Sequence, residues 1–142
     1  LYGTVASFYD PNEVSVPATL RSDARGWLFE LIKSPHAGQI FMSSTRPGES
    51  RGDHWHDTKV EKFTVVHGRG EIYFRELSSD KVIVYAVSGD EICTVDIPTG
   101  YVHAIRNVGD DDLLVLFWAS EILDPRLPDT HYEKVLPAHY DD

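Results

Sequence analysis

The middle of the chain is dominated by short segments in which apolar and polar residues alternate. In the segment 71–77, Ile72 and Phe74 fall on one face and charged neighbours fall on the other. Alternation with a period of two predicts a β-strand that is buried on one side. Segments of similar character occur at 27–32, 39–44, 62–67, 82–87, 102–108 and 113–119.

Clusters of Gly, Asp, Ser and Pro separate these segments, and no segment carries an apolar stripe at helical spacing. Several short strands with turn residues between them predict an all-β sandwich or barrel. A chain of 142 residues is expected to bury one hydrophobic core, so we predict a single domain over residues 1–142. The first 25 and last 20 residues are less patterned, and we expect these ends to pack around the barrel, pair with a second chain or be loose.

Charge and hydropathy exclude two classes of partner. The chain has 13 basic and 23 acidic residues, for a formal charge of -10, which opposes binding along a nucleic-acid backbone. No apolar run reaches the length of a membrane span. A small anionic ligand is still compatible, because a few basic residues in a pocket can make the local potential positive.

Cys93 is the single cysteine, so the chain has no internal disulfide. This suits a reducing compartment, and we predict a cytoplasmic protein. The run from Cys93 to Ile97 leans apolar, which predicts a buried structural thiol. Residues 1–4 lack an initiator Met and do not resemble a signal peptide, so we expect either a processed start or a piece of a longer protein.

The strongest chemical signal is a spacing of metal-ligand residues. His54 and His56 are separated by one position, which places both imidazoles on the same face of a strand. Glu61 follows at the start of the next predicted strand, and His103 lies near the start of a later one. We predict that these four side chains bind one divalent metal ion.

Three imidazoles and a carboxylate suit Zn, with Ni, Fe, Mn or Co as alternatives. A lone His is more often a structural or surface residue, and that is our expectation for the four His residues outside the spacing. These are His36, His67, His131 and His139.

The spacing resembles the two motifs of the cupins. Residues 48–68 read Gly-x5-His-x-His-x4-Glu-x6-Gly, and residues 98–107 read Pro-x-Gly-x2-His-x3-Asn. The resemblance implies a double-stranded β-helix, also called a jelly-roll barrel, with the metal inside. The second cupin motif usually has Gly six positions before its Pro, whereas this chain has Ile92. We therefore expect a longer hairpin before Pro98.

A finer resemblance is to the C-terminal cupin domain of CapF-type capsular polysaccharide enzymes. It extends from about residue 1 to residue 135 and includes two segments that are not general cupin features, Phe117-Trp118-Ala119-Ser120-Glu121 and Pro128-Asp129-Thr130. The other similar segments are 51–63, 87–90, 95–103 and 122–125.

This resemblance implies an activity on a UDP-sugar. In that family an N-terminal reductase domain binds NADPH, and the cupin domain epimerises C3 of a UDP-4-keto-6-deoxy-N-acetylhexosamine. The present chain has no glycine-rich dinucleotide motif, so reduction is not expected of it. Residues 1–4 resemble the junction after the reductase domain, which favours a C-terminal fragment, and we expect a homodimer.

Epimerisation next to a ketone needs a base and an acid within reach of the carbon. Lys59 and Tyr101 flank the ligands and are our candidates, while Arg51 could bind a diphosphate or the enolate. Their alternative roles are a solvated strand end for Lys59 and a packing aromatic for Tyr101. Asp53 and Asn107 could orient imidazoles or the hairpin.

Two other classes of function stay open at this point. One is a sugar-binding or regulatory module in which the ion only braces the barrel, and the other is an Fe-dependent dioxygenase. Structural zinc sites are closed and usually rich in thiolates, so three His and one Glu favour chemistry over bracing.

Overall fold

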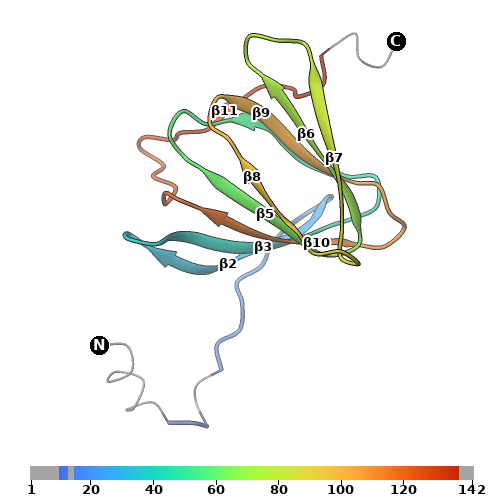
Figure 1. Ribbon diagram of the computed structural model, residues 1–142. Coiled ribbons are helices and arrows are strands. Elements are labelled where there is room, and N and C mark those ends of the chain that lie inside the picture. The colour runs from blue at the N-terminus through green and yellow to red at the C-terminus, as the bar shows by residue number, and fades with distance from the viewer. Residues whose placement is uncertain (1–9, 13–14, 138–142) are drawn as a thin grey trace.

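The computed structural model describes residues 10–12 and 15–137 (Figure 1). The expectations for residues 1–4 and for His139 fall outside these ranges.

Two antiparallel sheets face each other in the described part of the chain. The six-stranded sheet has the order β1-β2-β3-β10-β5-β8, and the five-stranded sheet has the order β11-β4-β9-β6-β7 (Figure 1). The first sheet consists of β1 (Arg21–Asp23), β2 (Gly26–Ser34), β3 (Gly38–Thr45), β10 (Leu113–Ala119), β5 (Glu61–His67) and β8 (Thr94–Ile97). The second consists of β11 (His131–Tyr132), β4 (Ser50–Trp55), β9 (Tyr101–Asn107), β6 (Arg69–Glu76) and β7 (Val82–Ser88).

The predicted all-β jelly roll is confirmed. Each of the seven predicted segments corresponds to a strand, with ends shifted by at most two residues. No helix occurs among the described residues, so none there has the length and apolar character that crossing a membrane requires.

The core lies between the two sheets and follows from the alternation in the sequence. Phe63 and Val65 of β5 and Val115 and Phe117 of β10 face inward and are buried. The rings of Phe63 and Phe117 meet edge to face, with centroids 4.5 Å apart. Opposing inward side chains from two sheets are what holds a β-sandwich together.

The connection between β7 and β8 corrects two predictions. These strands are the edges of opposite sheets, so residues 89–93 cross from one sheet to the other and do not close a hairpin. Cys93 lies in this crossing and is exposed, so the prediction of a buried thiol was wrong. The apolar residues of segment 93–97 belong to β8, where Ile97 is buried. Cys93 precedes this strand and is not part of it.

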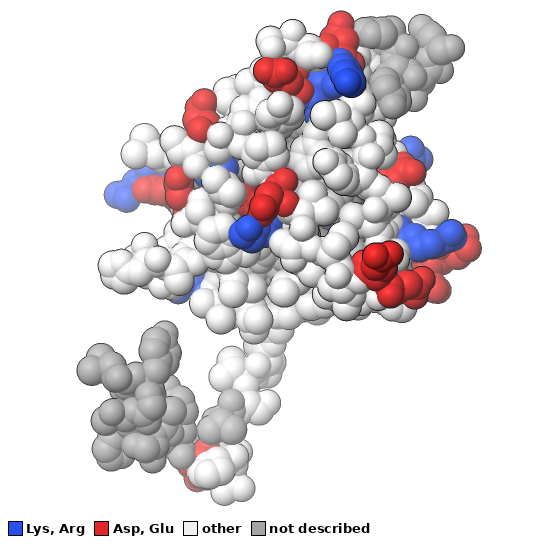
Figure 2. Space-filling view, in the orientation of Figure 1, with Lys and Arg blue, Asp and Glu red and all other residues white. Residues whose placement is uncertain are grey.

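Charged side chains are mixed on the molecular face that Figure 2 shows. Lys and Arg lie beside Asp and Glu there and do not gather into a basic patch. This distribution offers no broad positive surface on that face. The exclusion of nucleic acid stays a prediction.

Candidate metal centre

A bulge in β4 sets the direction of the first predicted ligand. Arg51 pairs with Ile105 and Gly52 with Ala104, but the next pair is His54 with His103, so Asp53 is an extra residue. Asp53 has a φ of 59°, and a Cβ on Gly52 would lie 2.6 Å from the His103 carbonyl oxygen. The bulge lets residues three apart, Arg51 and His54, both lie opposite inward-facing residues of β9.

The four predicted ligands converge inside the barrel. One ligand atom from each of His54, His56, Glu61 and His103 lies within 4.8 Å of all the others. Glu61 Oε2 is 3.2 Å from His103 Nε2 and 3.3 Å from His56 Nε2. His56, Glu61 and His103 are buried, and His54 is partly buried. This geometry can hold a metal ion.

Hydrogen bonds on the other ring nitrogens prepare two imidazoles for a cation. His103 Nδ1 lies 3.1 Å from the Tyr101 carbonyl oxygen, and His56 Nδ1 contacts the Asp129 carbonyl oxygen. A carbonyl oxygen accepts a hydrogen bond from Nδ1–H, and in the neutral ring this leaves the Nε2 lone pair for a metal. His56 Nε2 is buried without a hydrogen-bond partner among the described residues, because its contact with Glu61 lacks hydrogen-bond geometry.

The charge states also suit a cation. Burial, followed by the nearby His103, lowers the pKa of His54 to about 4, so this imidazole is neutral near pH 7. Burial alone would raise the pKa of Glu61, but the adjacent imidazoles of His103 and His56 lower it below its usual range. Neutral imidazole and ionised carboxylate are the forms that bind divalent metals.

Lys59 and Tyr101 occupy equivalent positions beside the ligands. Lys59 lies two residues before Glu61 and continues the buried and exposed alternation of β5. Its side chain is only 7% exposed, and its ammonium has no hydrogen bond or ion pair with a residue that the structure describes. Tyr101 lies two residues before His103 and packs against the core. The structure thus places both near the ligands, and their catalytic roles stay predictions.

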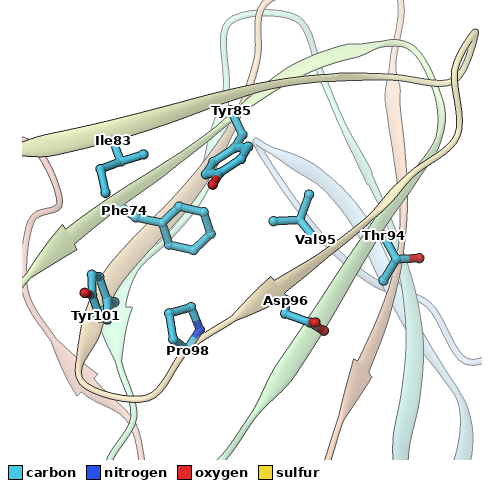
Figure 3. A pocket seen from close by; sticks show the side chains of 8 residues that line it. All are labelled: Phe74, Ile83, Tyr85, Thr94, Val95, Asp96, Pro98 and Tyr101. Atoms are coloured by element: carbon cyan, nitrogen blue, oxygen red, sulfur yellow. The ribbon is translucent and has the colours of Figure 1, made fainter.

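Tyr101 also lines a cavity of about 450 Å³ between the free edges of β7 and β8. Figure 3 shows the rings of Phe74, Tyr85 and Tyr101 gathered there with Pro98. Phe74 pairs with His103 across β6 and β9, so the cavity wall adjoins a predicted ligand.

The remaining candidates have mainly structural contacts. Arg51 donates hydrogen bonds from Nε to Thr45 Oγ1 at 2.9 Å and from Nη2 to the Ser44 and Trp27 carbonyls at 3.1 and 3.3 Å. Its role toward a diphosphate stays a prediction. Asp53 accepts hydrogen bonds from the Val135 N–H and the Lys134 ammonium. It therefore ties β4 to residues 134 and 135, and it makes no hydrogen bond to an imidazole of a described residue.

Asn107 is far from the ligands along β9. It donates to the Thr45 and Asp111 carbonyls, both at 2.8 Å, and accepts from the Gly109 N–H at 2.9 Å. Asn107 therefore organises the turn that follows β9, one of the two roles considered for it.

Comparison with known proteins identifies the family. The family described as the polysaccharide biosynthesis C-terminal domain matches residues 21–131. The chain belongs to this family.

Two longer proteins are similar to this chain over most of its length. The capsular polysaccharide assembling protein CapF from Staphylococcus aureus is 44% identical with a TM-score of 0.89, and the match covers 94% of this chain and 36% of that chain. A UDP-2-acetamido-2,6-beta-L-arabino-hexul-4-ose reductase from Pseudomonas aeruginosa is 35% identical over 131 residues, which is 92% of this chain and 35% of the relative. The chain thus spans about a third of the length of these two proteins.

More distant structures support the fold alone. The Drosophila melanogaster CENP-C cupin domain has a TM-score of 0.61 at 12% identity, over 72% of this chain and 75% of that chain. The cupin fold and the resemblance to the CapF-type domain are both confirmed.

Sequence reasoning missed one residue of the site. Asp129 contacts His56 and the loop after it. The sequence indicates only that the segment containing Asp129 is unusual for a cupin. A Pro-Asp-Thr triplet does not reveal a contact with a loop about seventy residues earlier in the chain.

Proposed function

We propose that this domain catalyses metal-dependent epimerisation at C3 of a UDP-4-keto-6-deoxy-N-acetylhexosamine in capsular polysaccharide biosynthesis, with zinc as the ion. The observation that carries the proposal is the convergence of His54, His56, Glu61 and His103 in a domain of a polysaccharide biosynthesis family. The Pseudomonas relative supports the substrate class, since its name describes a reductase of a 4-keto sugar nucleotide.

The reaction class follows from the chemistry of a ketone. A hydrogen on the carbon next to a carbonyl is acidic only when the negative charge that develops on the oxygen is stabilised. A bound divalent ion supplies that stabilisation as a Lewis acid. His54, His56, Glu61 and His103 would hold it, and the hydrogen bonds on His56 and His103 fix these two rings.

Lys59 and Tyr101 are the groups proposed to move protons. A base removes the C3 proton from one face, and an acid returns a proton to the other face, which inverts the centre. The ammonium of Lys59 is buried and unpaired with any described residue, so it is available for proton transfer with a bound substrate. Tyr101 lines the cavity of Figure 3, and its hydroxyl can donate or accept a proton.

Solvent exchange tests the proposal directly. The zinc-loaded protein is incubated in D₂O with a UDP-4-keto-6-deoxy-N-acetylhexosamine, and deuterium at C3 is measured by NMR. We expect incorporation by the parent and a loss of about 100-fold or more in Lys59→Met and in Tyr101→Phe. Lys62→Met and Tyr85→Phe are matched controls, because Lys62 is paired with Asp96 on the surface and Tyr85 lies on the outer side of the cavity.

Other results would favour the two other classes of function. Tight binding of the sugar nucleotide with no deuterium at C3 would favour a binding module. Consumption of dioxygen by the iron-loaded protein would favour a dioxygenase. If both Lys59→Met and Tyr101→Phe exchange at the parent rate, the acid and base have been misassigned.

A further inference from the structure

The C-terminal segment 129–135, here called the strap, lies along the strand that carries His54. Within the strap, β11 pairs with β4 through His131 with Trp55 and Tyr132 with His54. The Glu133 N–H then donates to the Asp53 carbonyl oxygen at 3.0 Å, and the ring of His131 stacks on Trp55 with centroids 4.2 Å apart. The strap therefore fixes one side of the metal centre.

The first residue of the strap, Asp129, binds the loop between two ligands. Its carboxylate accepts hydrogen bonds from the backbone N–H groups of Asp57 at 2.7 Å, Thr58 at 2.9 Å and Lys59 at 2.8 Å. The Thr58 hydroxyl donates a fourth, at 3.1 Å. Three successive N–H groups that converge on one anion hold a loop in a single conformation. This loop separates His56 from Glu61 and contains Lys59, one of the two groups proposed to move protons.

The main chain of Asp129 reaches a ligand as well. Its carbonyl oxygen contacts His56 Nδ1, the nitrogen on the far side of the ring from the buried Nε2. Asp129 thus fixes the loop with its side chain and the His56 ring with its backbone. Because the loop hydrogen bonds hold the Asp129 backbone in place, a change in the carboxylate is expected to disturb the His56 contact too.

We propose that Asp129 is a positioning residue that presets His56 and the 57–59 loop for metal binding. The inference rests on the proposed metal site, and it adds a residue about 70 positions away in sequence from the loop that it holds. A purely structural residue would alter the stability of the fold but not the affinity or geometry of the ion. Outer partners of metal ligands typically change metal affinity by about 10–100-fold.

The test compares Asp129→Asn with Asp124→Asn. An Asn side chain accepts through one oxygen only and turns an NH₂ group toward backbone N–H donors, so it cannot keep the loop contacts. Asp124 is the matched control, because its carboxylate also accepts a backbone N–H, from Arg126 at 2.9 Å, but in an exposed turn. The Zn²⁺ dissociation constant is measured by competition titration and the ligand geometry by the visible spectrum of bound Co²⁺.

We expect Asp129→Asn to weaken Zn²⁺ binding about 10–100-fold and to change the Co²⁺ spectrum, while Asp124→Asn matches the parent. Hydrogen exchange at residues 57–59 should accelerate in the metal-free variant while exchange in β6 keeps the parent rate. Parent affinity together with the parent spectrum in Asp129→Asn would overturn the inference.

A second variant and a second failure mode keep the test decisive. If Asp129→Asn does not fold, Asp129→Glu is measured instead, since it keeps the charge but displaces it by one methylene. Weaker Zn²⁺ binding supports the inference, and parent binding overturns it. If the parent chain itself binds neither Zn²⁺ nor Co²⁺, the proposed metal site fails and this inference fails with it.

Discussion

The two ends of the barrel interior differ in whether the buried polar side-chain atoms of Asn107 and His56 all have hydrogen-bond partners. At the end of β9 that Asn107 occupies, the amide is fully buried and has three hydrogen-bond partners. At the opposite end, His56 Nε2 is buried without a hydrogen-bond partner among the described residues. A satisfied buried group stabilises a fold, whereas an unsatisfied one costs free energy unless something else binds it.

The surroundings of the two ends differ in the same way. Near Asn107 the buried core combines aliphatic side chains such as Ile72, Leu113 and Val115 with the small hydroxyl side chains of Ser43, Ser44 and Thr45, and it has no ionisable ligand group among the described residues. Near His56 the interior contains two further imidazoles and a carboxylate. One end of the barrel therefore has a buried amide that stabilises the fold, and the other gathers side chains that can hold a metal ion.

The largest effect is expected from Glu61→Gln. This change keeps the size of the side chain but removes the negative charge from the ligand set, so Zn²⁺ affinity should fall by more than about 100-fold, beyond the range of outer partners. Titration with Zn²⁺ measures the affinity. Glu76→Gln, an exposed position at the end of β6, is the control. Parent affinity in Glu61→Gln would contradict the division between the two ends.

The next effect is expected from Asn107→Ala. Loss of its hydrogen bonds should lower the free energy of unfolding by about 2 kcal/mol, or about 30-fold in the equilibrium constant. Urea unfolding of the metal-free protein measures this change. Asp110→Ala, in the exposed turn nearby, should leave the stability at the parent value.

The contrast between the two ends would be wrong if Asn107→Ala weakened Zn²⁺ binding by the same factor of about 30 by which it lowers the folding equilibrium constant. Such a result would couple the two ends of the barrel.

A further effect is a pH dependence that belongs to the polar end. Burial lowers the pKa of His54 from its ordinary 6.5 to about 4. Between these values the unfolded chain binds a proton that the folded chain does not, so stability falls as pH falls through this window. The pKa of Glu61 is also lowered, from its ordinary 4.5. Stability that depends on the ionised carboxylate is therefore lost as the pH falls below 4.5.

Urea midpoints of the metal-free protein between pH 7 and pH 4 test this dependence. We expect a shallower slope in His54→Asn and the parent slope in His36→Asn, since His36 is exposed in a turn. Equal slopes in parent and His54→Asn would show that another group titrates.

The sequence alone determined the fold class and picked out the four candidate ligands. Alternation in segments such as 71–77 places side chains on two faces of a strand by local geometry, and the same geometry relates His54 to His56. Fixed offsets therefore carried enough information to name four residues that the structure brings within 4.8 Å.

Only the tertiary structure decided which residues support the site. Asp129 reaches the 57–59 loop because β11 pairs with β4, and Cys93 is exposed because its segment crosses between sheets. Both facts depend on how distant strands are ordered. Local periodicity fixes the face of a residue, but contacts between distant segments are set by the packing of the whole chain.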